Sequence, residues 1–274
     1  MKWQSVLRLS AMLGLAIAAS LAAGGRAKAA EEKPISDSFD AKGVRIHYVV
    51  QGQGDPVVLI HGLYSSAAIN WQMPGIFADL AKNHRVVALD LPGHGGSDKP
   101  KDDAAYGAQM AEDVILLMDH LNIPKAHIVG YSLGGIVALR VIADHPDRVL
   151  SGVLGGMGWL REGSGLQKIW EDMRPREGGG VPPACVNGIA KLAVTKEALK
   201  AISVPMTVLV GDRDPVGELY AVPLQSVRKD WPVVKIKDAG HINCVMKQEF
   251  KDELVNWVNR HGSAATTAPA EPKK

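Results

Sequence analysis

The feature that most constrains the fold is a change from strand to helix, almost without a loop, between residues 126 and 143. Residues 126–130 predict a buried strand and residues 134–143 predict a helix. So sharp a turn brings the two backbones nearly into contact, which requires very small residues at Gly130 and Gly134. The pattern predicts that Ser132 projects from the end of a strand, as a nucleophile must. The alternative is a glycine-rich turn with an incidental serine.

Strands and helices alternate along most of the remaining chain. Apolar runs predict strands at residues 44–50, 57–60, 85–90, 149–154, 206–210 and 233–236. The spacing of apolar residues predicts helices within 71–80 and over 110–121 and 247–260. This order predicts an α/β fold with a mostly parallel central sheet and helices on both of its faces.

The alternation is interrupted at residues 158–203, a stretch rich in Gly, Arg, Glu and Pro. We expect this stretch to form a small helical insertion, or lid, above the sheet. Residues 262–274 show no periodicity and predict a disordered tail. The chain has 274 residues, of which 46% are hydrophobic, so it can bury a sizeable core in one domain. We assign this domain to residues 30–261.

The first 29 residues have the layout of a secretory signal peptide. Lys2 and Arg8 precede an apolar run, and Ala27-Lys28-Ala29 forms a small-x-small site for cleavage before Ala30. The rival interpretation is an uncleaved anchor, but the run is shorter than the about 20 residues that span a bilayer. We therefore expect a bacterial protein that is exported to the periplasm or secreted, without stable membrane insertion after cleavage.

Net charge and cysteine content argue against two other classes of protein, nucleic-acid binders and disulfide-built scaffolds. The net charge is +2 and no basic tract is present, which argues against a nucleic-acid partner. The two cysteines, Cys185 and Cys244, are too few for a disulfide-built scaffold. They can pair in an oxidising compartment or remain two separate buried thiols, and both alternatives stay open.

From about residue 40 to residue 260, the chain resembles the α/β-hydrolase superfamily. The resemblance depends on four motifs in the order of the family: residues 61–63 (His-Gly-Leu), 90–97 (Asp-Leu-Pro-Gly-His-Gly-Gly-Ser), the serine turn, and 211–215 (Gly-Asp-Arg-Asp-Pro) followed by Gly-His at 240–241. It implies a catalytic triad of Ser132, Asp214 and His241. Asp212 is the alternative acid, but it directly follows a strand end, and Asp214 is better placed to reach the site.

The same resemblance implies further site residues. The backbone N–H groups of Leu63 and Leu133 are expected to form an oxyanion hole, with the imidazole of His61 supporting its loop. His94 lies in the tight turn after the fourth strand and is interpreted as structural. Four large side chains are candidates for an apolar substrate pocket, with ordinary core packing as the alternative: Tyr64, Tyr131, Met157 and Trp159.

These residues imply two-step acyl transfer that requires neither a metal nor an organic cofactor. A short insertion suits a small or medium-sized substrate, so we predict an exported serine hydrolase of carboxylic esters. The alternatives within enzymes are a meta-cleavage C–C bond hydrolase and a cofactor-free perhydrolase. Outside enzymes, the same fold can serve as a ligand-binding receptor.

Overall fold

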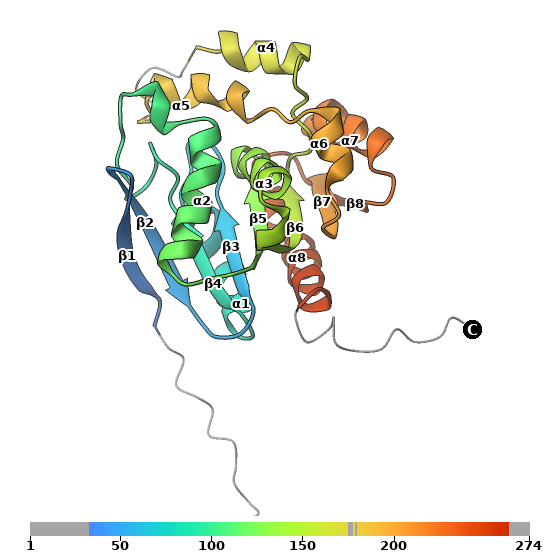
Figure 1. Cartoon of the computed structure of the whole chain (residues 1–274). Coiled ribbons are helices and arrows are strands. Elements are labelled where there is room, and N and C mark those ends of the chain that lie inside the picture. Colours follow the sequence, from blue (N-terminus) through green and yellow to red (C-terminus); the bar gives the residue numbers. More distant parts are fainter. Residues whose placement is uncertain (1–32, 175–177, 179, 263–274) are drawn as a thin grey trace, which may run out of the picture. The chain divides into compact units, whose positions relative to one another are not determined.

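The computed structural model describes residues 33–174, 178 and 180–262 (Figure 1). The predicted signal peptide and the predicted tail beyond Gly262 lie outside these residues, and Gly262 itself is buried. The described residues from Pro34 to Gly262 form one compact unit. In the described part of the chain, no helix is long and apolar enough to cross a membrane.

An eight-stranded sheet forms the centre of this unit, with the order β1-β2-β4-β3-β5-β6-β7-β8. Strand β2 pairs antiparallel with β1 and β4, and all other neighbouring strands are parallel. The predicted mostly parallel sheet is therefore confirmed. The strands are β1 (Ile35–Ala41), β2 (Val44–Gln51), β3 (Pro56–Ile60), β4 (Arg85–Leu89), β5 (Ala126–Tyr131), β6 (Val149–Gly155), β7 (Met206–Gly211) and β8 (Val233–Ile236).

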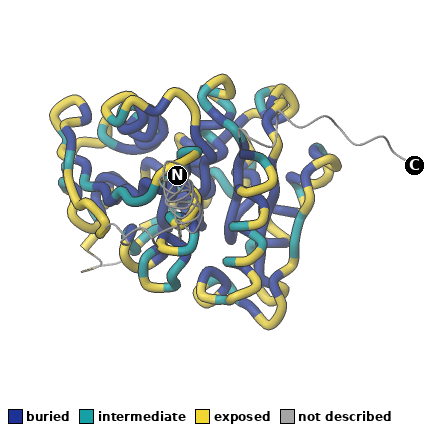
Figure 2. Tube along the Cα trace, turned by 90° about the horizontal axis from the view of Figure 1, so that it is seen from below, coloured by how far each residue is buried: buried dark blue, intermediate teal, exposed yellow. Residues whose placement is uncertain are grey.

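Helices cover both faces of the sheet, as predicted. Successive residues of a strand point to opposite faces, so each parallel strand contributes to two apolar cores. In β3, Val58 and Ile60 face one core, and Val57 and Leu59 face the other. The first core is covered by α2 (Ala108–His120), α3 (Leu133–Asp144), α6 (Lys196–Ala201) and α7 (Val222–Val227), and the second by α1 (Ile76–Ala81) and α8 (Gln248–Arg260). Figure 2 shows that buried segments run through the interior and exposed segments lie around them.

The interruption at residues 158–203 contains short helices, as its composition suggested. They are α4 (Gly165–Asp172), α5 (Pro183–Gly188), the 3₁₀ turn η4 (Ile189–Leu192) and α6. Figure 1 places α4 and α5 beyond the carboxyl ends of the parallel strands. The indole N–H of Trp159 donates to the carbonyl of Val194 at 2.8 Å and joins the beginning of this segment to its end.

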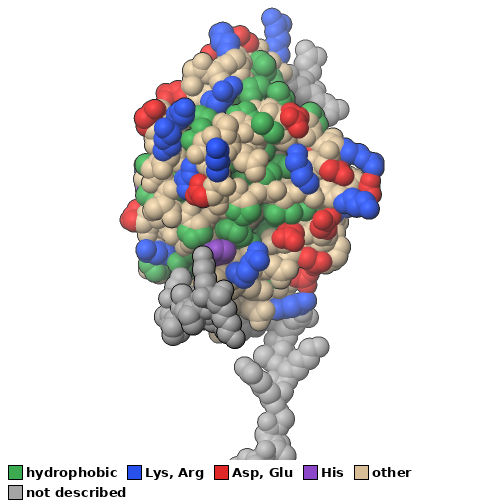
Figure 3. All heavy atoms as spheres, turned by 90° about the vertical axis from the view of Figure 1, so that its right-hand side faces the viewer, with side chains coloured by type: hydrophobic (Ala, Val, Ile, Leu, Met, Phe, Trp, Pro, Cys, Tyr) green, Lys and Arg blue, Asp and Glu red, His purple; other side chains and the backbone are tan. Residues whose placement is uncertain are grey.

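Strand β1 was not predicted from the sequence. Its residues, Ile-Ser-Asp-Ser-Phe-Asp-Ala, are mostly polar, and only Phe39 and Ala41 are buried. A strand at the edge of a sheet needs little apolar surface, because its backbone ladder to β2 holds it in place. At the opposite edge, β8 has only Ile236 fully buried. Figure 3, which shows this side of the molecule, has apolar side chains gathered across the face between charged ones.

Candidate active site

Ser132 occupies a strained turn between β5 and α3. Its backbone has φ 53° and ψ −118°, a conformation that is costly for any residue other than glycine. Its N–H donates to the carbonyl of Gly155 on β6 at 2.8 Å. A Cβ at Gly130 would lie 1.9 Å from the carbonyl oxygen of Gly134, and one at Gly134 would lie 2.0 Å from that of Ile60. The two glycines are therefore required by direct backbone contact.

The imidazole of His241 connects this serine to a carboxylate. The Oγ atom of Ser132 lies 2.9 Å from Nε2 of His241, and Nδ1 of His241 lies 2.8 Å from Oδ2 of Asp214. The Asp214 side chain is fully buried, and its other oxygen accepts from the N–H of Val216 at 2.9 Å. The structure therefore brings together the three side chains that the sequence nominated, from the ends of β5 and β7 and the loop after β8.

Asp212 lies beside Asp214 in the sequence but has another role. Its two carboxylate oxygens accept from the backbone N–H groups of Asp238 and Ala239 at 3.0 and 3.1 Å. These hydrogen bonds hold the pKa of Asp212 below its usual value. Asp212 thus supports the loop that leads to His241, and it is Asp214 that contacts the imidazole.

The loop after β3 lies directly against Ser132. A Cβ at Gly62 would be 3.2 Å from Cβ of Ser132, so the next residue, Leu63, begins beside the hydroxyl. Neither the N–H of Leu63 nor that of Leu133 donates a hydrogen bond to any group of the described residues. Leu133 opens α3, where the first N–H groups have no partner within the helix. Both N–H groups are thus available to an oxygen near Ser132.

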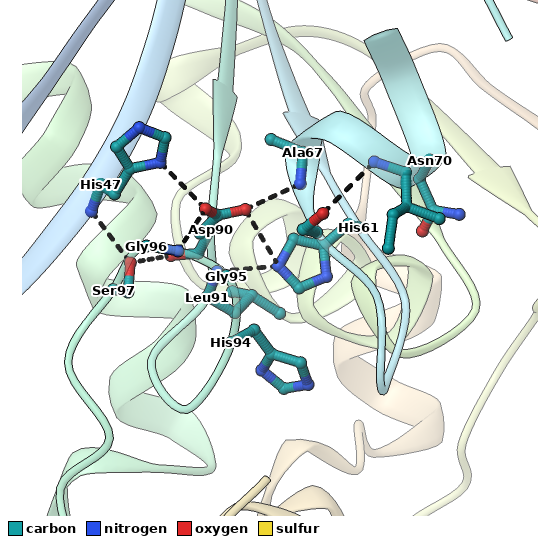
Figure 4. Close-up of polar contacts among 12 residues, drawn as sticks. His47, His61, Ala67, Asn70, Asp90, Leu91, His94, Gly95, Gly96 and Ser97 are labelled. Carbon is teal, nitrogen blue, oxygen red and sulfur yellow. Dashed lines mark hydrogen bonds and ion pairs between the residues drawn. The ribbon is translucent and has the colours of Figure 1, made fainter. Parts of the chain in front are cut away.

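Several side chains hold this loop in place (Figure 4). The N–H of Leu91 donates to Nε2 of His61 at 3.0 Å, so Nδ1 of His61 carries the proton and donates to the carbonyl of Gly62 at 2.7 Å. The amide oxygen of Asn70 accepts from the N–H of Gly62 at 2.8 Å. This role of Asn70 was not predicted, because an isolated amide next to an apolar helical stretch lies in no motif that identifies its partner.

Asp90 also holds this loop in place (Figure 4). One carboxylate oxygen accepts from the N–H of Ala67 at 2.7 Å, and the other accepts from Gly96 at 2.8 Å and contacts Nδ1 of His47 at 2.9 Å. Burial alone would raise the pKa of Asp90, but the two backbone N–H groups and the neighbouring imidazoles hold it below its usual value. The carboxylate therefore stays charged and ties the loop after β3 to the turn after β4.

Tyr131 does not match its predicted position in the pocket wall. Its ring belongs to the core between the sheet and α8, where it packs edge-on against Phe250 with ring centroids 5.7 Å apart. Its hydroxyl donates to the backbone carbonyl of His241 at 2.5 Å. In a strand, neighbouring side chains point to opposite faces, so the residue before the nucleophile is directed away from the substrate side.

The other pocket candidates occupy different environments. Tyr64 is 41% exposed, whereas Met157 and Trp159 are almost fully buried in the core that also contains Leu133. Met157 lies against Gly135 of α3. For these three residues, a role in a substrate pocket stays a prediction.

The cysteines do not form a disulfide. Cys185 in α5 and Cys244 after His241 are both free and buried, and they belong to the two different cores. Burial raises the pKa of each thiol to about 12. Among the described residues, no group of three or more His, Cys, Asp or Glu side chains is arranged to hold a metal ion.

Comparison with known proteins agrees with this fold. Residues 55–176, which include Ser132 but not Asp214 or His241, match the family model described as the alpha/beta hydrolase fold. The structure also superposes on a meta-cleavage product hydrolase from Pseudomonas fluorescens IP01 with a TM-score of 0.67 and 25% identity, covering 82% of this chain and 98% of that one. This chain has the α/β-hydrolase fold.

Two sequence relatives match part of this chain. The "Putative carbamate hydrolase RutD" of Variovorax paradoxus is 43% identical over 111 residues, which is 40% of this chain and 41% of that protein. The 2-hydroxymuconate semialdehyde hydrolase of a Pseudomonas species is 36% identical over 135 residues, 47% of each chain. The chain thus spans less than half the length of each of these relatives.

Proposed function

We propose that this protein is a serine hydrolase that cleaves small to medium-sized carboxylic esters through an acyl-enzyme intermediate. The observation that carries the proposal is the continuous contact from Ser132 through His241 to Asp214, at 2.9 and 2.8 Å. These are hydrogen-bond distances between a nucleophile, a base and the group that orients the base.

In the proposed first step, Oγ of Ser132 attacks the ester carbonyl while Nε2 of His241 takes the hydroxyl proton. Asp214 accepts from Nδ1–H of the imidazole, which keeps Nε2 free to act as the base and stabilises the imidazolium. The negative charge on the former carbonyl oxygen is met by the N–H groups of Leu63 and Leu133. Each such donor contributes about 3 kcal/mol to transition-state stabilisation in acyl transfer.

Collapse of the tetrahedral intermediate breaks the bond to the alcohol, which leaves with the proton from His241. The acyl group remains on Ser132 as an ester. Water then attacks this ester while His241 again takes a proton, and the carboxylic acid is released as the proton returns to Ser132. Every proton and bond in this sequence is accounted for by the three side chains, the substrate and water.

A second candidate is hydrolysis of a carbon–carbon bond next to a ketone. It is favoured by the match to a 2-hydroxymuconate semialdehyde hydrolase and by the structural likeness to a meta-cleavage product hydrolase. The two reactions share an electrophilic carbonyl and an oxyanion, so the substrate alone separates them.

A fluorophosphonate probe and a substrate panel test the proposal. We expect rapid labelling of the wild type, none of Ser132→Ala, and turnover of p-nitrophenyl esters that is fastest for short acyl chains. Turnover of a vinylogous diketone in place of the esters would establish the second candidate. An unreactive Ser132 would instead indicate a ligand-binding receptor.

We also propose that the protein acts outside the cytoplasm, on the basis of the signal-peptide pattern in residues 1–29. Expression in a bacterial host, fractionation and N-terminal sequencing test this proposal. A mature periplasmic or secreted chain that begins at Ala30 is expected. A cytoplasmic protein that retains Met1 or Lys2 would contradict it.

A further inference from the structure

The turn that presents Leu63 to the nucleophile contains a strained residue. The N–H of Ser65 donates to the carbonyl of Gly62 at 3.2 Å and closes a four-residue turn. Tyr64, at the third position of this turn, has φ +59°, where glycine is strongly preferred. A side chain in this conformation costs about 1–2 kcal/mol, so contacts elsewhere must stabilise it.

One of these contacts comes from the turn after β4. The N–H of Tyr64 donates to Nε2 of His94 at 3.2 Å. Nδ1 of His94 lies 3.1 Å from the carbonyl of Pro92, which can only accept, so Nδ1 carries the proton and Nε2 is the acceptor. Burial lowers the pKa of His94 to about 3, so the imidazole stays neutral at ordinary pH.

His94 is itself held firmly. It is 2% exposed, and its ring lies at 61° to the ring of His61 with centroids 5.0 Å apart (Figure 4). The turn that carries it is fixed by Asp90, which accepts from the N–H of Gly96. The acceptor for Tyr64 is therefore part of a rigid frame rather than a mobile side chain.

The consequence reaches Leu63 through one peptide plane. The carbonyl of Gly62 and the N–H of Leu63 belong to the same planar group and point in opposite directions. That carbonyl accepts from the N–H of Ser65 and from Nδ1 of His61 at 2.7 Å. A turn closed in this way forms with its third residue either helical or left-handed, and the two forms differ by reversal of the peptide between the second and third residues, here Leu63 and Tyr64. By accepting from the N–H of Tyr64, His94 fixes the direction of that peptide and so holds the backbone of Leu63 on the other side of its N–H.

We propose that His94 is a positioning residue for the oxyanion hole, which it maintains by accepting a hydrogen bond from the N–H of Tyr64. This inference rests on the proposed function, because it concerns the N–H that binds the oxyanion. It assigns catalytic importance to a histidine that touches neither the substrate nor the triad.

A matched pair of substitutions tests the role of the acceptor. In His94→Gln, the amide oxygen can take the place of Nε2 and accept from Tyr64. In His94→Asn, the amide nitrogen can take the place of Nδ1 and donate to Pro92, but no acceptor reaches Tyr64. We expect His94→Gln to keep kcat for p-nitrophenyl acetate within about 3-fold, and His94→Asn to lower it about 30-fold, a fraction of the loss that follows removal of a whole oxyanion donor.

Two further readouts separate positioning from simple stabilisation. KM should change less than about 2-fold in both variants, and the inhibition constant of a trifluoromethyl ketone, which forms an oxyanion on Ser132, should rise in parallel with the loss of kcat. Rates are normalised to folded enzyme by active-site titration. If His94 were only structural, both variants would lose thermal stability and the folded fraction would keep its kcat.

These measurements separate a failure of the inference about His94 from a failure of the proposed function. If the wild type is active and the two variants have equal kcat, the inference is wrong and the function stands. If the wild type shows no serine reactivity, both are wrong. Should neither variant fold, ¹⁵N NMR of the wild type decides, because a protonated Nε2 on His94 between pH 5 and 8 would overturn the inference.

Discussion

The hydroxyl of Tyr131 donates a hydrogen bond of 2.5 Å to the backbone carbonyl of His241. Burial raises the pKa of Tyr131, so this hydroxyl stays protonated and remains a donor. The residue before Ser132 thus holds the loop that carries His241. Tyr131→Phe removes this hydrogen bond together with the contacts of the hydroxyl to Cys244 and Val245. We expect kcat to fall about 10-fold with little change in KM, and stability to fall by about 1 kcal/mol.

Steady-state ester kinetics and denaturant unfolding measure these two effects. Tyr106→Phe is a matched control, because Tyr106 is also buried and also donates to a backbone carbonyl, that of Pro100 at 2.8 Å. The control should lose similar stability and keep its kcat. Equal kinetic losses in the two variants would contradict a positioning role for Tyr131.

Asp214→Asn and Asp212→Asn should differ sharply. An amide at position 214 cannot hold the imidazole of His241 in the required tautomer, and we expect kcat to fall by about 10⁴-fold, as in other serine triads. An amide at position 212 weakens the contacts to Asp238 and Ala239, so stability should fall while kcat stays within about 10-fold. Kinetics on both purified variants, with circular dichroism to confirm folding, measure the difference. The reverse order of the two losses would show that the acid has been misassigned.

Gly134→Ala should abolish folding or cost more than about 4 kcal/mol of stability. The added Cβ would lie 2.0 Å from the carbonyl oxygen of Ile60 and 2.7 Å from that of His61, and neither backbone can move without shifting β3. Gly165→Ala is the control, because no atom lies within 4 Å of a Cβ at that position. Its stability should stay within about 0.5 kcal/mol of the wild type. Denaturant unfolding compares the two, and a stable Gly134→Ala protein would contradict the observed contact.

Asp113→Asn should stabilise the protein at neutral pH. Asp113 is 2% exposed in α2, its main polar partner is Gln109 at 2.8 Å, and burial raises its pKa to about 6. The folded state then binds a proton more tightly than the unfolded state, so this group opposes folding increasingly as pH rises from about 4 to about 6. We expect a gain of about 2 kcal/mol at pH 7 that disappears near pH 4.

Unfolding of the wild type and Asp113→Asn at several pH values measures this gain. Comparing the two proteins at each pH cancels the contributions of other groups, such as His127, whose pKa burial lowers to about 4. A difference that does not depend on pH would indicate that Asp113 is ionised in both states.

The central part of the fold was predictable from sequence because the apolar pattern of each strand is enough to identify it. Strands β3 to β7 are continuous apolar runs, which only a sheet covered on both faces can bury. Strand β1 carries no such signal, since its position depends on pairing with β2 rather than on its own side chains. The segment of residues 68–72, a π-helical turn before α1, was likewise not predicted, because its conformation depends on contacts with other parts of the chain.

The same distinction applies to the site. Ser132, Asp214 and His241 follow strand ends and lie in motifs, so sequence alone nominated them. The frame around them was predicted only in part. His61 was expected to support the loop of Leu63, but the contacts of Asn70 and His94 were not predicted, because both act through hydrogen bonds to backbone groups of other turns. Tyr131 was a candidate for the pocket but lies in the second core, because alternation along β5 directs its side chain to that face of the sheet.

Residues 132 and 241 are separated by 109 positions in the chain, and the acid lies between them on a third segment. The ribosome synthesises these segments in order, so a nascent chain contains Ser132 long before it contains His241, the proposed base. On the proposed mechanism, the unfinished product cannot acylate itself or its neighbours during translation. On the same mechanism, a chain that ends before residue 241 would lack the base that activates Ser132.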